Sequence, residues 1–153
     1  MSGWAGLNIF AETSARRRSR IRDRRIHDRR ILYVDDELSM RLAVARVLRG
    51  AGAVCLGSGS HDQAVVLVAF EPRLDLAILD FQMPDGDVGR LVRRLHWQRP
   101  ALPVVGTSAS DRRSEFATRG VDRFLPKPWA LDDLIRVADW AEAPGSQVSV
   151  SGP

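Results

Sequence analysis

Short apolar runs alternate with helix-like patterns along the middle of the chain. Five of these runs are four to six residues long and almost continuously apolar, which is typical of strands buried on both faces of a sheet. The predicted strands span residues 31–34, 53–57, 74–79, 102–107 and 123–126. Runs of this length are typical of strands and are too short for buried helices, so the pattern favours a sheet at the centre of the fold.

A helix-like segment follows every predicted strand, although the segment 110–120 is short and polar. In the first of these segments, Leu42, Ala45, Val47 and Leu48 are expected to face the core. The predicted helices span residues 40–52, 60–70, 88–98, 110–120 and 130–141. Five successive strand–helix units predict an α/β fold, in which a five-stranded parallel sheet is flanked by helices on both faces.

The two ends of the chain lack this pattern. Residues 1–30 hold nine arginines and three acids, and the segment 16–30 is too rich in like charge to fold on its own. The last residues are small and polar and are interrupted by Gly and Pro. We therefore expect a disordered arginine-rich arm over residues 1–28, one folded domain over residues 29–142, and a flexible tail over residues 143–153.

The net charge of +4 is located in the arm, because residues 31–153 alone carry a net charge of −2. Binding of nucleic acid is therefore a possibility only for the segment 16–30. No aromatic residue lies between these arginines, so base stacking gains no support, and an unstructured leader without a binding role is the competing interpretation. No apolar run approaches the roughly 20 residues that span a bilayer. Together with the single cysteine, Cys55, this predicts a soluble cytoplasmic protein without a membrane contact.

Polar side chains follow four of the five predicted strands. Asp35 and Asp36 follow the first, Asp80 the third, Ser108 the fourth and Lys127 the fifth. The carboxyl ends of parallel strands meet at one edge of the sheet, where ligands of such folds bind. Three carboxylates, an amine and a hydroxyl at this edge indicate a site for a hard cation such as Mg²⁺.

These residues resemble the motifs of the response-regulator receiver domain of two-component signalling, which has a (βα)5 flavodoxin-like fold. The resemblance covers residues 29–142. It rests on VDDE at 34–37, LDFQMPDGD at 79–87, SA at 108–109 and KP at 127–128. Each motif alone is weak, but the four occur in order and each lies at a strand end.

The resemblance implies a role for each residue of the site. Asp80 is expected to accept a phosphoryl group from the phosphohistidine of a sensor histidine kinase or a phosphotransfer protein. Asp36 is expected to bind Mg²⁺ directly, Asp35 through a water, and Gln82 through its backbone carbonyl. Lys127 is expected to contact the phosphoryl oxygens as a movable point charge.

The resemblance also implies a switch. The hydroxyl of Ser108 is expected to close on the phosphoryl group, with Thr107 and Ser110 as the alternative hydroxyls. Phe124, three residues before the lysine, is expected to swing inward when Ser108 moves, although it is also interpreted as a strand residue that packs in the core. The partner that reads this switch is an unknown output protein, and the chain is expected to be a monomer or a phosphorylation-dependent dimer.

Two other functions compete with this interpretation. In the first, the arm binds nucleic acid and the folded domain is a scaffold. In the second, the chain is an aspartyl-phosphate phosphatase of the haloacid-dehalogenase type. Such phosphatases need a second acid two residues after the nucleophile, where this chain has Gln82, so we do not expect an enzyme that turns over an external substrate.

A few remaining residues are expected to be structural. Cys55 is interpreted as a small core residue. His27, His61 and His96 lack the spacing of metal ligands and are expected to be solvated or at helix ends. Trp97 is expected to cover the core or an interface, as are Trp129 and Trp140.

Overall fold

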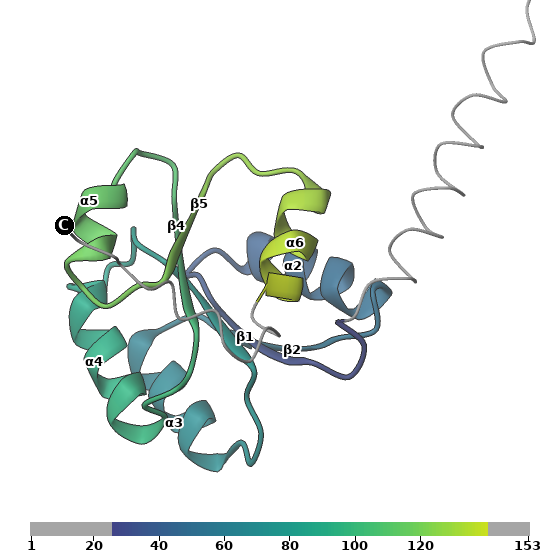
Figure 1. Cartoon of the computed structure of the whole chain (residues 1–153), viewed down its shortest axis with the longest axis horizontal. Coiled ribbons are helices and arrows are strands. Elements are labelled where there is room, and N and C mark those ends of the chain that lie inside the picture. Colours follow the sequence, from purple (N-terminus) through teal and green to yellow (C-terminus); the bar gives the residue numbers. More distant parts are fainter. Residues whose placement is uncertain (1–25, 141–153) are drawn as a thin grey trace, which may run out of the picture.

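A five-stranded parallel sheet forms the centre of the structure, a computed structural model that describes residues 26–140, apart from the side chains of residues 116 and 117 (Figure 1). The strand order is β2-β1-β3-β4-β5, and every neighbouring pair is parallel. The strands are β1 (Arg30–Val34), β2 (Val54–Ser58), β3 (Leu76–Asp80), β4 (Val104–Ser108) and β5 (Arg123–Pro126). The α/β fold predicted from the sequence is therefore confirmed.

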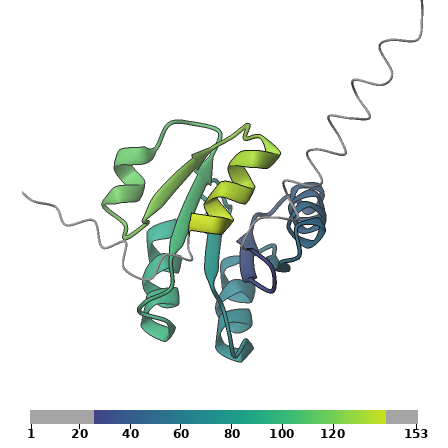
Figure 2. The ribbon, with the colours of Figure 1, turned by 45° about the vertical axis from the view of Figure 1, so that its right-hand side comes forward.

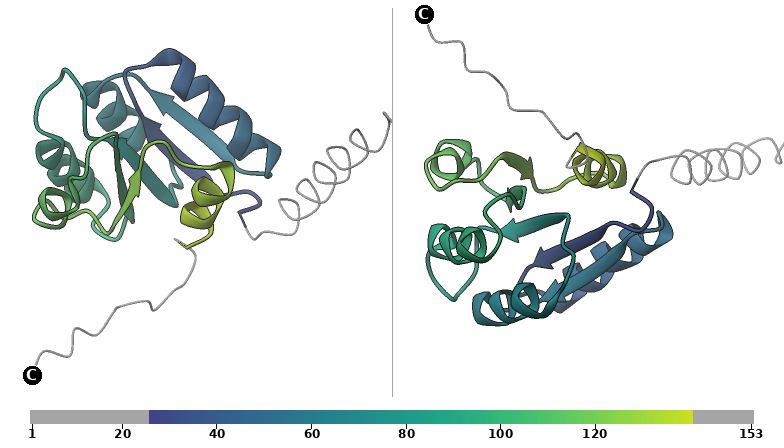
Figure 3. Two further views of the ribbon diagram at one scale, coloured as in Figure 1. Left: turned by 90° about the horizontal axis from the view of Figure 1, so that it is seen from above. Right: turned by 60° about the horizontal axis from the view of Figure 1, so that its bottom comes forward.

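Five helices cover the two faces of the sheet. They are α2 (Leu38–Gly50), α3 (His61–Phe70), α4 (Val88–Gln98), α5 (Arg113–Ala117) and α6 (Leu131–Trp140). Helices α2 and α6 share one buried apolar cluster with the sheet, and α3 and α4 share a second one on the opposite face (Figure 3). Within residues 26–140, none of the helices has both the length and the apolar character that crossing a membrane requires.

Three of the strands, β2, β3 and β4, end one residue later than the apolar runs do. Asp80 and Ser108 are the last residues of β3 and β4, not the first residues after them. The ladder includes them because Asp80 pairs with Thr107, and the backbone N–H of Phe81 donates to the Thr107 carbonyl. A polar side chain does not end a parallel strand as long as its backbone hydrogen bonds are made.

The apolar stripe of α2 differs from the predicted one. Val44, Ala45 and Leu48 are buried, whereas Leu42 is 62% exposed. Successive helical residues are rotated by about 100°, so Leu42 lies about 160° away from Val44 around the axis. The expectation that Leu42 faces the core was wrong.

Helix α5 is shorter than the predicted segment 110–120, because only residues 113–117 are helical. It lies beside β5 at one edge of the sheet (Figure 2). Ser110 therefore belongs to the loop between β4 and α5, on the same side of the sheet as the strand ends. This loop position matters for the site.

The described fold begins three residues before the expected boundary at residue 29. Ile26 is fully buried in the cluster beneath α2 and α6. Arg29 is buried and donates to the carbonyl of Ala138, and Arg30 forms an ion pair with Glu71 at 2.5 Å. Two arginines of the segment 16–30 thus have partners inside the fold. The expected arm up to residue 25 and the tail from residue 143 lie outside the described residues.

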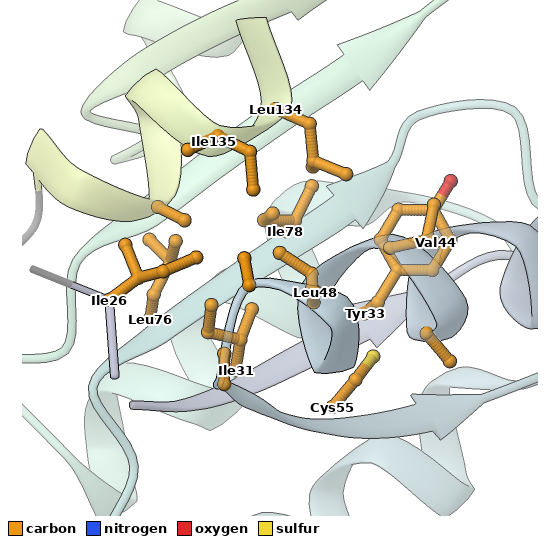
Figure 4. Packing of buried hydrophobic residues seen from close by; sticks show 14 of the residues in the cluster. Ile26, Ile31, Tyr33, Val44, Leu48, Cys55, Leu76, Ile78, Leu134 and Ile135 are labelled. Carbon is orange, nitrogen blue, oxygen red and sulfur yellow. The ribbon is translucent and has the colours of Figure 1, made fainter. Parts of the chain in front are cut away.

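Cys55 lies in the same buried cluster, where it is 4% exposed (Figure 4). Burial raises the pKa of its thiol to about 11. Because only the thiolate exchanges with disulfides, we expect the native chain to react with a disulfide reagent at pH 8 at least about a hundredfold more slowly than the chain in urea. Release of the reagent's chromophore measures both rates, and equal rates would mean that Cys55 is accessible.

Candidate functional site

Three strands bring their polar ends together at the carboxyl edge of the sheet. The Lys127 ammonium, directly after β5, lies 2.9 Å from Oδ2 of Asp35 and 3.1 Å from Oδ2 of Asp80. Asp35 follows β1, and Asp80 ends β3, the neighbour of β1. Asp36 completes the group, because one carboxylate oxygen from each of the three acids lies within 4.8 Å of the others. The edge rule of parallel sheets therefore placed these four residues correctly.

Asp35 is held by three donors. Tyr33 donates its hydroxyl to Oδ2 at 2.9 Å, Lys127 donates to the same oxygen, and the backbone N–H of Glu37 donates to Oδ1 at 2.9 Å. Asp35 is only 1% exposed, whereas Asp36 is exposed, and no described residue donates to the Asp36 carboxylate. The two adjacent acids thus differ, since Asp36 keeps its oxygens available and Asp35 does not.

Tyr33 is a site residue that the sequence reasoning missed. Its ring packs in the core beside Val44, and its hydroxyl reaches the site (Figure 4). Burial, followed by the negative charge of Asp35, raises the pKa of this hydroxyl far above its ordinary value, so it stays a donor. The two-residue period of a strand places residues 33 and 35 on the same face, and this signal could have revealed the contact.

We expect the substitution Tyr33→Phe to lower the free energy of unfolding by about 1.5–3 kcal/mol, because it removes a hydrogen bond to a buried charge. Urea denaturation followed by circular dichroism measures this loss. Thr107→Val is the matched control, since it removes a buried hydroxyl that has no hydrogen-bond partner among the described residues. That control should change the free energy by less than about 0.5 kcal/mol. Equal losses in the two variants would mean that the hydrogen bond from Tyr33 to Asp35 does not stabilise the fold.

Asp80 is enclosed by the site and is 5% exposed. Its Oδ1 accepts the backbone N–H of Gln82 at 3.0 Å, and its Oδ2 accepts Lys127. Burial raises the pKa of the Asp80 carboxyl, and the hydrogen bonds from Gln82 and Lys127 only partly offset it. Burial alone would lower the pKa of Lys127, but the hydrogen bond to Asp35 and the charge of Asp80 outweigh it and raise the pKa. The site is therefore an amine shared by two buried carboxylates, with more negative than positive charge.

A row of hydroxyls leads away from Asp80. Ser108 is fully buried at the end of β4, and its Oγ accepts the backbone N–H of Ser110 at 3.3 Å. The hydroxyl of Ser110 in turn lies 3.4 Å from Nε2 of Gln82, which donates to it. Thr107, the third predicted hydroxyl, is buried without a side-chain partner among the described residues. Of the three hydroxyls, Ser108 and Ser110 therefore belong to one network with the loop after Asp80.

Two aromatic residues connect the site with α5. Phe81, which directly follows Asp80, has the guanidinium groups of Arg112 and Arg119 at 4.9 and 5.0 Å from its ring centroid, and these two arginines flank α5. Phe124 on β5 is half-buried against the α3–α4 cluster, and the guanidinium of Arg113 lies 5.8 Å from its ring. Both interpretations of Phe124 are compatible with a half-buried position.

Arg41 on α2 is a second residue that the sequence did not reveal. Its guanidinium donates to the backbone carbonyl of Asp35 at 2.7 Å and lies over the loop between β2 and α3. A Cβ on Gly59 would lie 3.0 Å from this guanidinium, so any larger residue there would push the arginine aside by a few tenths of an ångström. The position of Arg41 in the sequence gives no sign that its side chain contacts the backbone of Asp35.

His61 lies at a helix end, one of the two positions expected for the histidines. It begins α3, as a helix-end histidine should, but it is 7% exposed and is therefore not solvated. Burial lowers the pKa of its imidazole, and Nε2 has no hydrogen-bond partner among the described residues.

The acidic cluster fits a magnesium ion by its chemistry. All of its donors are oxygens, as a small hard cation requires, and no nitrogen or sulfur ligand of the described residues joins them. Asp36, the exposed member, is open to an ion that keeps several waters.

Comparisons with known proteins agree with this geometry. The family model of the response regulator receiver domain matches residues 31–139. The response regulator MprA of Mycolicibacterium vanbaalenii is 34% identical over 109 residues, which is 69% of this chain and 47% of that protein, so the chain spans about half the length of this relative. The receiver domain of the hybrid histidine kinase CckA is 29% identical, with a TM-score of 0.63 over 73% of this chain and 97% of that one. The chemotaxis response regulator CheY4 of Vibrio cholerae, at 24% identity, shares the fold with a TM-score of 0.67 over 74% of this chain and 98% of its own. This chain therefore belongs to the response regulator receiver domain family.

Proposed function

We propose that Asp80 accepts a phosphoryl group from the phosphohistidine of a sensor histidine kinase or a phosphotransfer protein. The observation that carries this proposal is the position of the Lys127 ammonium between the carboxylates of Asp35 and Asp80, beside Asp36. Receiver domains are signalling modules of two-component systems, and an acceptor that loses its own phosphoryl group turns over no external substrate.

The chemistry is an in-line displacement at phosphorus. A carboxylate oxygen of Asp80 attacks, the P–N bond to the donor imidazole breaks, and an acyl phosphate forms on Asp80. Negative charge spreads over the phosphoryl oxygens during the transfer, and Lys127 is within reach to neutralise part of it. The raised pKa of Asp80 reflects a carboxylate that burial has deprived of water, which makes it a better nucleophile than a solvated one.

Asp36 and Asp80 would hold Mg²⁺ directly, with Asp35 acting through a water and Gln82 through its backbone carbonyl. When bound, the ion supplies the remaining positive charge for the phosphoryl oxygens. The engaged oxygens of Asp35 and the available oxygens of Asp36 support this division of roles.

Ser108 and Phe124 would carry the signal to an output protein. Ser108 lies in the hydroxyl network that reaches Gln82, so its movement toward a phosphoryl group would disturb the loop before α5. Phe124 is paired with Gly106 across β4 and β5, two residues from Ser108. The surface of α5 and β5 would then bind the partner or a second copy of the chain.

Incubation with a small phosphodonor and Mg²⁺, followed by measurement of the intact mass, tests the function. The chain should gain one phosphoryl group that is lost at alkaline pH, and the gain should stop when a chelator removes the metal. If the chain gains no phosphoryl group under these conditions, the proposal fails.

Mg²⁺ should also stabilise the chain, because an ion that binds only the native state raises the free energy of unfolding by RT ln(1 + [Mg²⁺]/Kd). We expect Asp36→Asn to abolish this gain while leaving the metal-free stability nearly unchanged, since Asp36 is exposed and accepts no hydrogen bond from the described residues. Thermal denaturation with and without Mg²⁺ measures both effects. Asp85→Asn, an exposed acid outside the cluster, is the control and should respond to Mg²⁺ like the wild type.

The competing function, binding of nucleic acid through residues 16–30, falls mostly outside the described residues. Arg29 and Arg30, the two arginines of this segment that are described, have protein partners. No observation of the structure favours it.

A further inference from the structure

Three arginines and a tryptophan form one line along the outer face of α4. Arg90, Arg93, Arg94 and Trp97 follow the spacing of three, four and seven residues that aligns side chains on a helix. This α4 stripe lies opposite the buried face of the helix, which consists of Val88, Gly89, Leu91, Val92 and Leu95. Trp97 is 90% exposed, so it does not cover the core, and the other expectation for it, an interface, remains.

The positive charge of the α4 stripe is mostly unpaired. Arg94 lies 2.8 Å from Asp62, but Asp62 is 88% exposed, and exposed pairs of this kind hold their partners weakly. Among residues 26–140, neither Arg90 nor Arg93 forms an ion pair. Because residues 31–153 carry a net negative charge, this local concentration of arginine is not a property of the whole surface.

A hollow lies beside the α4 stripe, at the junction of α4 with α3. It has a volume of about 280 Å³, is open to solvent, and is lined on the α3 side by Val65. The side-chain amide of Gln98, which also lines it, donates to the Val65 carbonyl at 3.4 Å. Figure 1 shows the two helices side by side. Pockets for small-molecule ligands usually start at about 300 Å³. At about 280 Å³ the hollow lies at the lower end of this range and has room for one bulky side chain.

We propose that the α4 stripe binds an acidic peptide segment of a partner protein, which places one bulky apolar side chain in the hollow. Its carboxylates would lie on Arg90 and Arg93, whose planar guanidinium groups match a carboxylate with two parallel hydrogen bonds. Exposed tryptophan and arginine are also the residues that contribute most to protein–protein interfaces.

Single-stranded nucleic acid fits this surface less well. The rise of a helix separates Arg90 from Arg94 by only about 6 Å, which leaves room for little more than one phosphate. Arg90 and Arg94 also line a second hollow of about 210 Å³ together with Asp62, Asp85 and Asp87, and these three acids would repel a phosphate backbone that continued past Arg90. A peptide can end its acidic part at Arg90, with its following residues toward Trp97.

The proposal is independent of phosphorylation, because Asp80 and Lys127 take no part in the α4 stripe. We expect selection of random displayed peptides on the full chain to enrich sequences with two or more acids near a Leu, Phe or Trp. Synthetic copies of the enriched peptides should bind roughly tenfold more weakly to the variants Arg93→Glu and Trp97→Ala, measured by fluorescence anisotropy. Both side chains are exposed, so neither change should disturb the fold, and circular dichroism checks this.

Arg46→Glu is the matched control, since Arg46 is an exposed arginine on α2 without an ion pair among the described residues. It reverses the same charge and should retain binding within about twofold. The proposal is overturned if selection yields no peptide that depends on Arg93 and Trp97, if the enriched peptides lack acids, or if Arg46→Glu weakens binding as much as Arg93→Glu. It is also overturned if an oligo-dT probe binds the same residues more tightly than the peptides at equal salt.

Discussion

Replacement of Asp80 by Asn should abolish uptake of a phosphoryl group from a small phosphodonor, while the wild type takes up one group per chain. The amide of Asn has no anionic oxygen to attack phosphorus, and no neighbour can restore one. Asn has the same size but only one acceptor oxygen, so it keeps the hydrogen bond from either Gln82 or Lys127 and loses the other. Intact mass and the alkaline lability of the product measure the outcome.

Stability provides an independent check that the Asp80→Asn variant is folded. Burial raises the pKa of Asp80, so the folded state binds its proton more tightly than the unfolded state does. The contribution of this group to stability is therefore favourable below its ordinary carboxyl pKa and is lost as the pH rises through the folded pKa. At neutral pH without metal, the Asn variant should be more stable than the wild type, and the difference should vanish in acid.

Asp75→Asn is the matched control, because Asp75 precedes the same strand at the opposite edge of the sheet, where it accepts the backbone N–H of Arg30. This variant should be phosphorylated like the wild type. Equal phosphorylation of Asp80→Asn and the wild type would move the acceptor to another carboxylate, and Asp36 is the first alternative because it belongs to the same cluster.

The sequence predicted the site well because its members come from a backbone rule and not from side-chain detail. Asp35 and Lys127 are 92 positions apart, yet both follow a parallel strand, and the carboxyl ends of such strands must lie together. Continuous apolar runs identified the strands. The residues at their carboxyl ends could therefore be named, even where the ends of strands were misplaced by one or two residues.

The sequence did not reveal how each helix is rotated about its axis, nor which long side chains extend into the site. Leu42 was placed on the wrong side of α2 because several apolar residues surround this helix. The spacing alone does not show which of them face the sheet. Arg41 donates to the Asp35 carbonyl while its guanidinium packs closely on Gly59 of another loop, a contact that no local pattern encodes. Tyr33 was counted as an apolar strand residue, although its hydroxyl provides one of three donors to Asp35.

Lys127 is the only lysine of the chain, which holds 22 arginines. An ammonium differs from a guanidinium in being a compact point charge on a flexible stem, which suits a group that serves two carboxylates and then a phosphoryl oxygen. Its side chain is 18% exposed, and Asp35 and Asp80 are nearly buried. Because it is unique, a single isotope-labelled lysine signal reports on the site without interference.

Lys127→Gln should lower the free energy of unfolding without metal by about 3 kcal/mol, since it leaves two buried carboxylates without their cation. The loss should shrink in acid, because protonation of Asp80 then removes one of the charges, and Mg²⁺ should restore much of it at neutral pH. Urea denaturation at several pH values measures these changes. A loss below about 0.5 kcal/mol at neutral pH would contradict the compensating role of the ammonium.

The same variant should take up the phosphoryl group about 10²- to 10³-fold more slowly, the usual effect of removing one preorganised donor from a developing negative charge. Lys127→Arg separates the two roles of the residue. It retains the charge and should therefore recover more of the stability than of the rate, because a planar guanidinium cannot take the place of a movable ammonium at both carboxylates and the phosphoryl oxygen. If Arg restored rate and stability equally, charge alone would suffice at this position, and the geometry of the amine between Asp35 and Asp80 would have no part in the transfer.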